Sequence, residues 1–248
     1  MATVGVFDSG SGGLSVLREI RKILPHERFI YYSDNAHCPY GEKTPEYIID
    51  RSMAVSRELL SRGAQAIVVA CNTATAAAIA SLRSSFSIPF VGMEPAVKPA
   101  AMLTRSGVVG VLATAGTLRA PKYLNIRGNY EGRVRIVESV GKGFVELVES
   151  LELDGPHAEA LVRGSLCPLL DEGADTVVLG CTHYPFLLPL MQRIAPDGVT
   201  FIDPAPAVAR RLRDVLGMGG IATGEGEGSV ELLSSGPAAT LQKLFSLI

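Results

Sequence analysis

The chain has 248 residues, and 23 Lys and Arg stand against 25 Asp and Glu, for a net charge of −2. This balance does not favour nucleic acid or an anionic membrane surface as a partner. Because 47% of the residues are hydrophobic, we expect a folded chain of one large or two small domains. Residues 1–10 lack the basic segment of a signal peptide, and four cysteines are too few for a disulfide scaffold, so a cytoplasmic protein is expected.

Short apolar runs alternate with helical patterns along the chain. We expect strands at 3–8, 28–34, 64–71, 89–93, 107–114, 133–140, 175–181, 199–203 and 229–233. Helical patterns cover 14–23, 44–62, 73–86 and 205–216, and the second begins with Thr44 as its N-cap and Pro45 at its first position. This alternation predicts an α/β fold with mainly parallel sheets.

Two segments of the first half of the sequence have similar counterparts in the second half. Residues 4–10 resemble residues 109–115, and residues 68–73 resemble residues 178–183. The offsets are 105 and 110 residues. Strand–turn–helix units often look alike, but a cysteine at the same point of both copies favours two pseudo-symmetric α/β halves.

Cys71 and Cys181 each end an apolar strand and precede a polar residue. Ligands of open α/β sheets bind beyond the carboxyl ends of the strands, where the next helix presents free N–H groups. Such a position binds a carboxylate and lowers the pKa of a thiol, so we expect reactive thiols here. A cysteine at a strand end is also often a small buried hydrophobic residue.

Paired thiols suit the removal of a proton from one face of an α-carbon and its delivery to the other face. A single nucleophilic cysteine would leave the second one unexplained. Zinc is not expected, since neither Cys181-Thr182-His183 nor His37-Cys38 has the usual ligand spacing.

The remaining polar turns are less specific. Residues 8–13 are glycine-rich but lack the last glycine of a dinucleotide loop, so a nucleotide is not expected. Tyr40 and the N–H of Gly41 are candidates to hold a carboxylate. Glu146 and Glu149 share a helix face, so either carboxylate could serve the site.

Four segments together resemble the glutamate racemases, cofactor-independent enzymes of the aspartate/glutamate racemase superfamily. They are residues 5–14, 38–41, 70–75 and 179–185, and residues 94–100 and 207–211 are similar too. The resemblance implies two α/β domains, 1–95 plus 207–248 and 96–206, with the active site at their interface. It implies no cofactor and no metal, and a homodimer is expected.

The resemblance also implies the roles of individual residues. Cys71 and Cys181 would be the two bases, for the D- and the L-enantiomer respectively, assisted by Asp8, His183 and Glu149. The expected substrate contacts, which also include Asp8, His183 and both cysteines, are Ser9, Pro39, Tyr40, Gly41, Asn72, Thr73, Thr114, Thr117 and Thr182. Ser11 stands where relatives often have a small apolar residue, and we expect little effect from it.

These observations predict interconversion of L- and D-glutamate, with D-glutamate supplied to peptidoglycan synthesis. One alternative is a related racemase that acts on aspartate or another acid. Another is a non-catalytic amino-acid-binding module, since two lobes around a cleft would also serve binding. Two matched thiols favour catalysis, because a binding site gains nothing from a base on each face.

Overall fold

The computed structural model describes residues 1–221 and 224–248. The strands are β1 (Thr3–Asp8), β2 (Arg28–Ser33), β3 (Ala66–Val69), β4 (Phe90–Gly92), β5 (Val108–Ala113), β6 (Arg135–Val140), β7 (Thr176–Gly180), β8 (Thr200–Ile202) and β9 (Ser229–Ser234). The α-helices are α1 (Leu14–Ile23), α2 (Pro45–Ser61), α3 (Asn72–Ser85), α4 (Val97–Leu103), α5 (Ala115–Arg119), α6 (Pro121–Gly128), α7 (Phe144–Glu149), α8 (Pro156–Asp171), α9 (Leu188–Ile194), α10 (Ala205–Met218) and α11 (Ala239–Phe245). Three 3-10 turns are η1 (Asn35–His37), η2 (Tyr40–Glu42) and η3 (Tyr184–Leu187).

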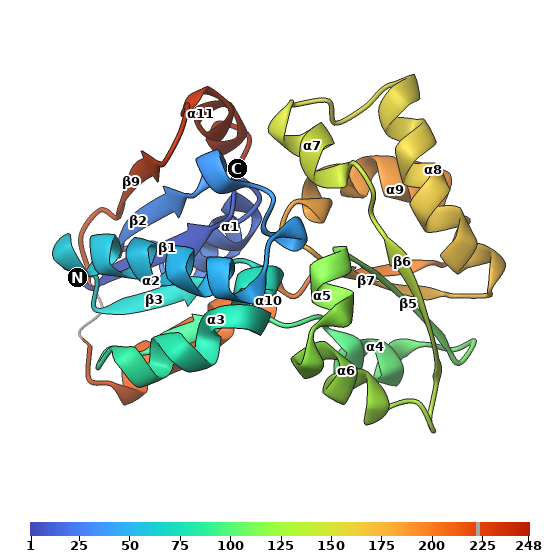
Figure 1. Cartoon of the computed structure of the whole chain (residues 1–248), viewed down its shortest axis with the longest axis horizontal. Helices are drawn as coiled ribbons and strands as arrows, with labels where there is room; N and C mark the ends of the chain where they lie inside the picture. The colour runs from blue at the N-terminus through green and yellow to red at the C-terminus, as the bar shows by residue number, and fades with distance from the viewer. Residues whose placement is uncertain (222–223) are drawn as a thin grey trace.

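The strands form two separate sheets that lie in the two halves of the molecule (Figure 1). One sheet has the order β4-β3-β1-β2-β9, and the other has the order β6-β5-β7-β8. Every strand pairing among the described residues is parallel. The predicted α/β class with two mainly parallel sheets is therefore confirmed.

The two sheets repeat one topology. In the first sheet β1 lies between β2 and β3, and in the second sheet β5 lies between β6 and β7 in the same relation. The repeated segments of the sequence fall on these equivalent strands, since residues 4–10 and residues 109–115 each begin at the second residue of their strand, β1 or β5, and run past its end. The internal similarity thus reflects two related halves.

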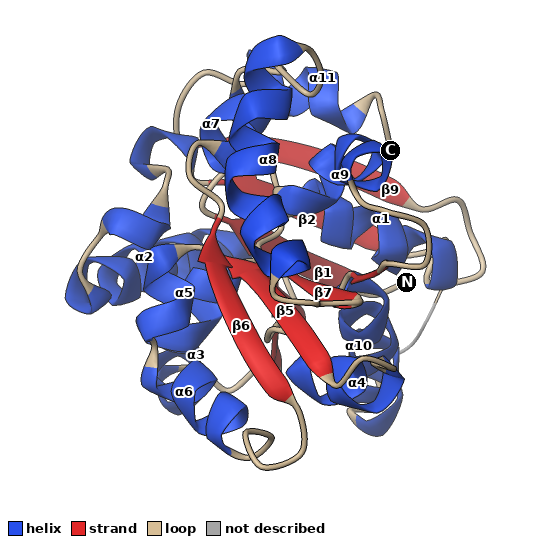
Figure 2. Ribbon diagram, turned by 90° about the vertical axis from the view of Figure 1, so that its right-hand side faces the viewer, coloured by secondary structure: helices blue, strands red, loops and turns tan. Residues whose placement is uncertain are grey.

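The strands are apolar on both faces because helices cover both faces of each sheet. In the second sheet, Val109 and Val111 of β5 pack in one cluster with Val97 of α4. Gly110, between them, points the other way, toward Leu169 of α8. Figure 2 shows the strands β5, β6 and β7 between these helical layers.

The predicted helix signals act locally as expected. The Thr44 side chain accepts a hydrogen bond from the backbone N–H of Tyr47, and Pro45 is the first residue of α2.

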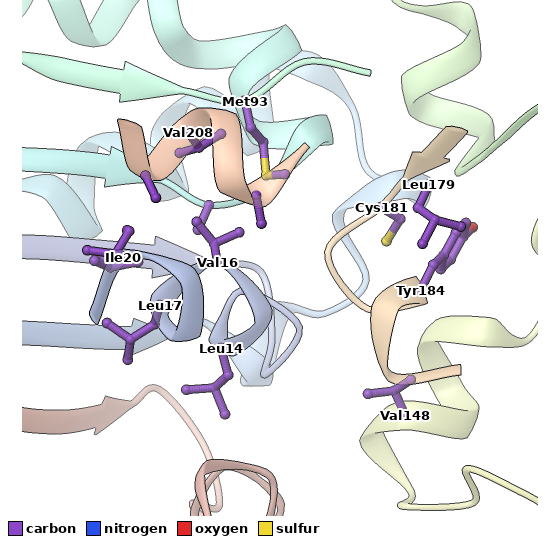
Figure 3. Close-up of a cluster of buried hydrophobic side chains, with 14 of the residues drawn as sticks. Leu14, Val16, Leu17, Ile20, Met93, Val148, Leu179, Cys181, Tyr184 and Val208 are labelled. Carbon is purple, nitrogen blue, oxygen red and sulfur yellow. The ribbon is translucent and has the colours of Figure 1, made fainter. Parts of the chain in front are cut away.

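Helix α10 packs against α1 beside the first sheet, where Leu17, Ile20 and Val208 belong to one buried cluster (Figure 3). The chain therefore crosses back to the first sheet after β8, and β9 pairs there with β2.

Among residues 1–221 and 224–248, no helix combines the length and the apolar character that crossing a membrane requires.

Candidate active site

Cys71 follows β3 and is the N-cap of α3. Its Sγ accepts a hydrogen bond from the backbone N–H of Ala74 at 3.4 Å and lies 3.8 Å from the hydroxyl oxygen of Ser9. The thiol is almost fully buried. The side chain therefore combines a helix N-terminus with exclusion from water.

Asp8 ends β1 and is completely buried beside this thiol. Its Oδ2 accepts hydrogen bonds from the backbone N–H groups of Gly13 at 3.0 Å and Gly10 at 3.3 Å. Its Oδ1 accepts one from the Thr182 hydroxyl at 3.4 Å. Burial nevertheless raises the pKa of Asp8, with the positive charge of His183 acting in the opposite direction.

Burial raises the pKa of the Cys71 thiol well above its usual range, and the Asp8 carboxylate raises this pKa further. The hydrogen bond from Ala74 acts in the opposite direction but is outweighed. The expectation that the helix N-terminus lowers this thiol pKa is therefore wrong for Cys71. A negative charge on Cys181 also raises the pKa of Cys71, so the two thiols are close enough to interact electrostatically.

Cys181 follows β7, the strand equivalent to β3, and is also almost fully buried. Figure 3 shows it in the turn after the strand, with Leu179 and Tyr184 nearby. The segment that follows is the 3-10 turn η3, and α9 begins only at Leu188. Cys181 therefore does not lie at the N-terminus of an α-helix, as was expected. A neighbouring side chain interacts with its thiol instead.

That side chain is His183, whose Nδ1 lies 3.8 Å from Cys181 Sγ. Its Nε2 lies 2.8 Å from Oε1 of Glu149, at the end of α7. Burial by itself would lower the pKa of His183, but interactions with Cys181, Cys38 and Glu149 outweigh burial and raise it well above its usual value. His183 is thus a neighbour of the second thiol whose surroundings favour the protonated ring.

Glu149 is held from a second side by Ser11. The Ser11 backbone N–H donates to Oε1 at 2.6 Å, and its hydroxyl donates to Oε2 at 3.1 Å. Burial opposes ionisation of Glu149, but His183 and Ser11 together keep its pKa below the usual value. Ser11 thus links the first sheet to this carboxylate, and the expectation that a serine here has little effect stays a prediction. Of the two candidate glutamates, the one that reaches the site is Glu149.

Asn72, the first residue of α3, has a side-chain amide without a hydrogen-bond partner among the described residues. It is buried, and neither its Oδ1 nor its Nδ2 has a hydrogen-bond partner among the residues that the structure describes. A buried amide without partners is costly unless a ligand supplies them. Asn72 is therefore the clearest mark of a ligand-binding position beside Cys71.

Three threonines join the two halves of the molecule next to Asn72. The Oγ1 atom of Thr73 lies 3.1 Å from that of Thr114 and 3.3 Å from that of Thr117. Thr114 also caps α5 through the Thr117 N–H. The structure thus brings all three predicted hydroxyls together.

Pro39, Tyr40 and Gly41 lie on the turn that precedes α2. The Tyr40 hydroxyl donates to Oδ2 of Asp34 at 2.5 Å, and Arg51 of α2 binds both oxygens of the same carboxylate. The expectation that this hydroxyl holds a substrate carboxylate is therefore wrong here, because Asp34 occupies it. Gly41 instead faces Thr114 and Gly116 of the other half.

A cavity of about 400 Å³ lies beside this contact, with Gly41 and Thr73 in its wall. Lys43 and Arg119 are also part of its lining, whereas neither Cys71 nor Cys181 is among its described lining residues. Both thiols are therefore buried outside the wall of this cavity.

Cys38 and Arg51 belong to this site region but were not expected there. Cys38 packs near His183 and Glu149. Its place in the segment that resembles the racemases was a signal, although its chemistry was not predicted. Arg51 lies in the middle of an amphipathic helix, and nothing in the sequence marks it.

Residues 4–212 match the family model described as Asp/Glu/Hydantoin racemase. The glutamate racemase of Ectopseudomonas mendocina is 50% identical over 248 residues, which are 100% of this chain and 94% of that protein. That of Methylococcus capsulatus is 52% identical over 236 residues, or 95% and 87% of the two chains.

A solved structure with the same fold is Escherichia coli glutamate racemase in complex with L-glutamate and the activator UDP-MurNAc-ala. It superposes with a TM-score of 0.88 at 35% sequence identity, covering 99% of this chain and 94% of that one. The chain belongs to the Asp/Glu/hydantoin racemase family and is an enzyme of the glutamate racemase group.

Proposed function

We propose that this enzyme interconverts L- and D-glutamate without a cofactor, with Cys71 and Cys181 as the two α-proton bases. The observation that carries the proposal is the placement of these thiols after equivalent strands of the two halves, each with its own polar partner. In one direction one cysteine takes the α-proton as a thiolate while the other, as a thiol, donates a proton to the opposite face.

Different side chains lie beside the two proposed bases. Asp8 and Ser9 stand beside Cys71, and the His183–Glu149 pair stands beside Cys181. We propose that Cys71 acts on D-glutamate and Cys181 on L-glutamate, with Asp8 and His183 holding the proton that each thiol exchanges. Both thiols are excluded from water, which strengthens the interaction of a thiolate with a bound α-proton.

The substrate would lie between the thiols, where Asn72 offers a carbonyl oxygen and an amide N–H₂ that are otherwise unpartnered. We propose that it contacts the ammonium and a carboxylate of glutamate. Ser9, Thr73, Thr114, Thr117, Thr182 and the backbone of Pro39, Tyr40 and Gly41 complete the proposed binding set. Residues 1–95 with 207–248 and residues 96–206 are the proposed domains that enclose it.

The proposed product, D-glutamate, serves peptidoglycan synthesis in a bacterial cytoplasm. The homodimer expected from the sequence stays a prediction, which the mass from light scattering at several concentrations would test.

The decisive experiment follows L-glutamate in D₂O with the purified chain, a reductant and a chelator. We expect loss of the α-proton NMR signal and of optical activity, in step. With two bases, early product should carry deuterium while recovered substrate keeps its proton, because the donating thiol has exchanged with solvent. Early exchange in recovered substrate would indicate one base, and binding without turnover of glutamate, aspartate or other acids would indicate a binding module.

A further inference from the structure

Three potential metal ligands of different kinds converge behind Cys181. The Sγ of Cys38, a carboxylate oxygen of Glu149 and a ring nitrogen of His183 all lie within 4.8 Å of one another. They come from three separate segments, namely the turn before η2, the end of α7 and the turn after β7. The cluster is therefore a product of the tertiary fold.

Gly10 leaves the space in which the three ligand atoms meet. A Cβ at this position would lie 2.3 Å from Glu149 Oε1, 3.0 Å from Cys38 Sγ and 3.1 Å from His183 Nε2. The three atoms thus surround one point next to the Gly10 backbone. Ser11 fixes the Glu149 carboxylate with two hydrogen bonds, as neighbouring groups do for metal ligands.

The cluster is open to a cavity on one side. Cys38 and Glu149 are part of the lining of a cavity of about 290 Å³, together with Asn35 and Thr240. His183 is buried behind them. An ion can therefore reach the three ligands from the cavity, and a water molecule can occupy a fourth position.

We propose that Cys38, Glu149 and His183 bind a divalent cation of the zinc class and that this binding inhibits the enzyme. Thiolate, imidazole and carboxylate are the ligands that zinc takes, whereas Mg²⁺ and Ca²⁺ prefer oxygen ligands alone. Zinc ligands stand about 3.3–3.8 Å apart in a tetrahedral site. The His183–Glu149 separation of 2.8 Å must therefore widen by about 0.5–1 Å, and Cys38, which lies within 4.8 Å of both, must approach by at most about 1.5 Å.

To bind the ion, the imidazolium form of His183 must lose its Nε2 proton and Cys38 its thiol proton, and both protons pass to solvent. Inhibition would follow because the ion then occupies the Nε2 electron pair of His183 and separates the ring from Glu149. His183 could then no longer carry the proton that it exchanges with Cys181. This inhibition rests on the proposed function, whereas the binding of the cation does not.

The test uses the whole chain, stripped with EDTA and desalted, and titrated with ZnCl₂ by calorimetry against a competing chelator. Racemisation of glutamate is assayed in the same samples. The key variant is Cys38→Val, which removes one ligand, and its inhibition by zinc is measured against its own zinc-free rate because Cys38 lies beside His183. Cys167→Val is the matched control, because Cys167 is a second partly buried free cysteine, on α8.

We expect one zinc per wild-type or Cys167→Val chain, with inhibition that EDTA reverses and that MgCl₂ does not cause. Cys38→Val should bind zinc at least about 100-fold more weakly and keep its own zinc-free rate when zinc is added. Glu149→Gln should weaken zinc binding as well, which keeps the test decisive if Cys38→Val fails to fold.

Three results would overturn the proposal or part of it. Absence of zinc binding to the wild-type chain overturns it, and so does equal zinc inhibition of Cys38→Val, which would place the ion on Cys71 and Cys181. Zinc binding that depends on Cys38 but leaves turnover unchanged removes the inhibitory role alone. A zinc-free chain without racemase activity contradicts the proposed function, while the calorimetry still tests the site.

Discussion

Cys71 and Cys181 occupy the same position in the two halves of the molecule, directly beyond the carboxyl ends of the equivalent strands β3 and β7. Their surroundings are nevertheless different. Cys71 caps a helix and lies beside Asp8, whereas Cys181 precedes a 3-10 turn and lies beside His183, whose pKa is raised. The repeated topology places two thiols in equivalent positions, and each thiol has a different polar neighbour.

Replacement of either thiol should abolish racemisation. We expect Cys71→Ser and Cys181→Ser each to lower kcat/KM in both directions by at least about 10²–10⁴-fold, because a hydroxyl is a far weaker acid than a thiol. Cys167→Ser, on α8, is the control and should remain active. Initial rates from L- and from D-glutamate measure the effect, and one fully active single variant at 71 or 181 would rule out two-thiol catalysis.

The raised pKa of Cys71 predicts a rate that increases with pH. Since little of this thiol is ionised near neutrality, kcat/KM for D-glutamate should rise about tenfold per pH unit across pH 6.5–8.5. The Asp8 carboxylate raises that pKa, so Asp8→Asn should move the rise to lower pH while also reducing kcat. Asp214→Asn, at an exposed position of α10, should leave the profile in place. A flat profile for the wild-type enzyme would contradict the assignment of Cys71 as this base.

Because Gly41 and Gly116 are in close contact, we expect a methyl group added at Gly116 to push the two halves of the molecule apart. A Cβ at Gly116 would lie 2.9 Å from the carbonyl oxygen of Gly41. We expect Gly116→Ala to raise KM for glutamate several-fold and to cost about 1–3 kcal/mol of unfolding free energy, as overpacking does. Steady-state kinetics and urea unfolding measure both.

The control for this substitution is Gly164→Ala in the middle of α8, where a Cβ would meet no described atom within 4 Å. It should stabilise the chain by about 0.5–1 kcal/mol and leave KM unchanged. An unaltered KM in Gly116→Ala would mean that closure at this contact does not affect substrate binding.

The buried ion pair between Asp34 and Arg51 predicts a coupled loss of stability and binding. Arg51 donates to both oxygens of Asp34, whose side chain is fully buried and also receives the Tyr40 hydroxyl. Arg51→Met leaves a buried carboxylate without its charge partner, which should cost about 2–4 kcal/mol at pH 7. We also expect a higher KM, because the Tyr40–Gly41 turn loses its support. Urea unfolding and steady-state kinetics are the measurements, with the exposed Arg57→Met on α2 as the control.

The stability lost in Arg51→Met should become smaller as the pH falls. Burial opposes ionisation of Asp34, but Arg51 and Tyr40 hold its pKa below the usual value of an aspartate, about 3.9. The contribution of the pair is therefore present above that value and is lost as pH falls through the lowered pKa of the folded chain. Unfolding at pH 7 and at pH 3.5 should show a smaller difference between variant and wild type at the lower pH, and a constant difference would contradict the assignment.

The local structure of this protein follows closely from its sequence. The Thr44-Pro45 start of α2, the apolar runs that became strands, and the polar residues directly after them are signals between near neighbours in the chain. Parallel strands bring their carboxyl ends to one edge, so the positions of Cys71, Asn72, Cys181 and Thr182 near a ligand site were predictable. The repeat at nearly constant spacing predicted two related halves.

The chemistry of those positions was decided by contacts between segments far apart in the sequence. Ser11 with Glu149, Cys38 with His183, and Gly41 with Gly116 meet only when the two halves close on each other. Burial also reversed a local expectation, since desolvation at Cys71 outweighs the helix N-terminus that would lower its thiol pKa. Periodicity and turn residues act over a few positions, so the sequence alone determined the elements and the place of the thiols. Desolvation and charge pairing depend on everything packed around a group, so only the tertiary structure decided how those thiols are tuned.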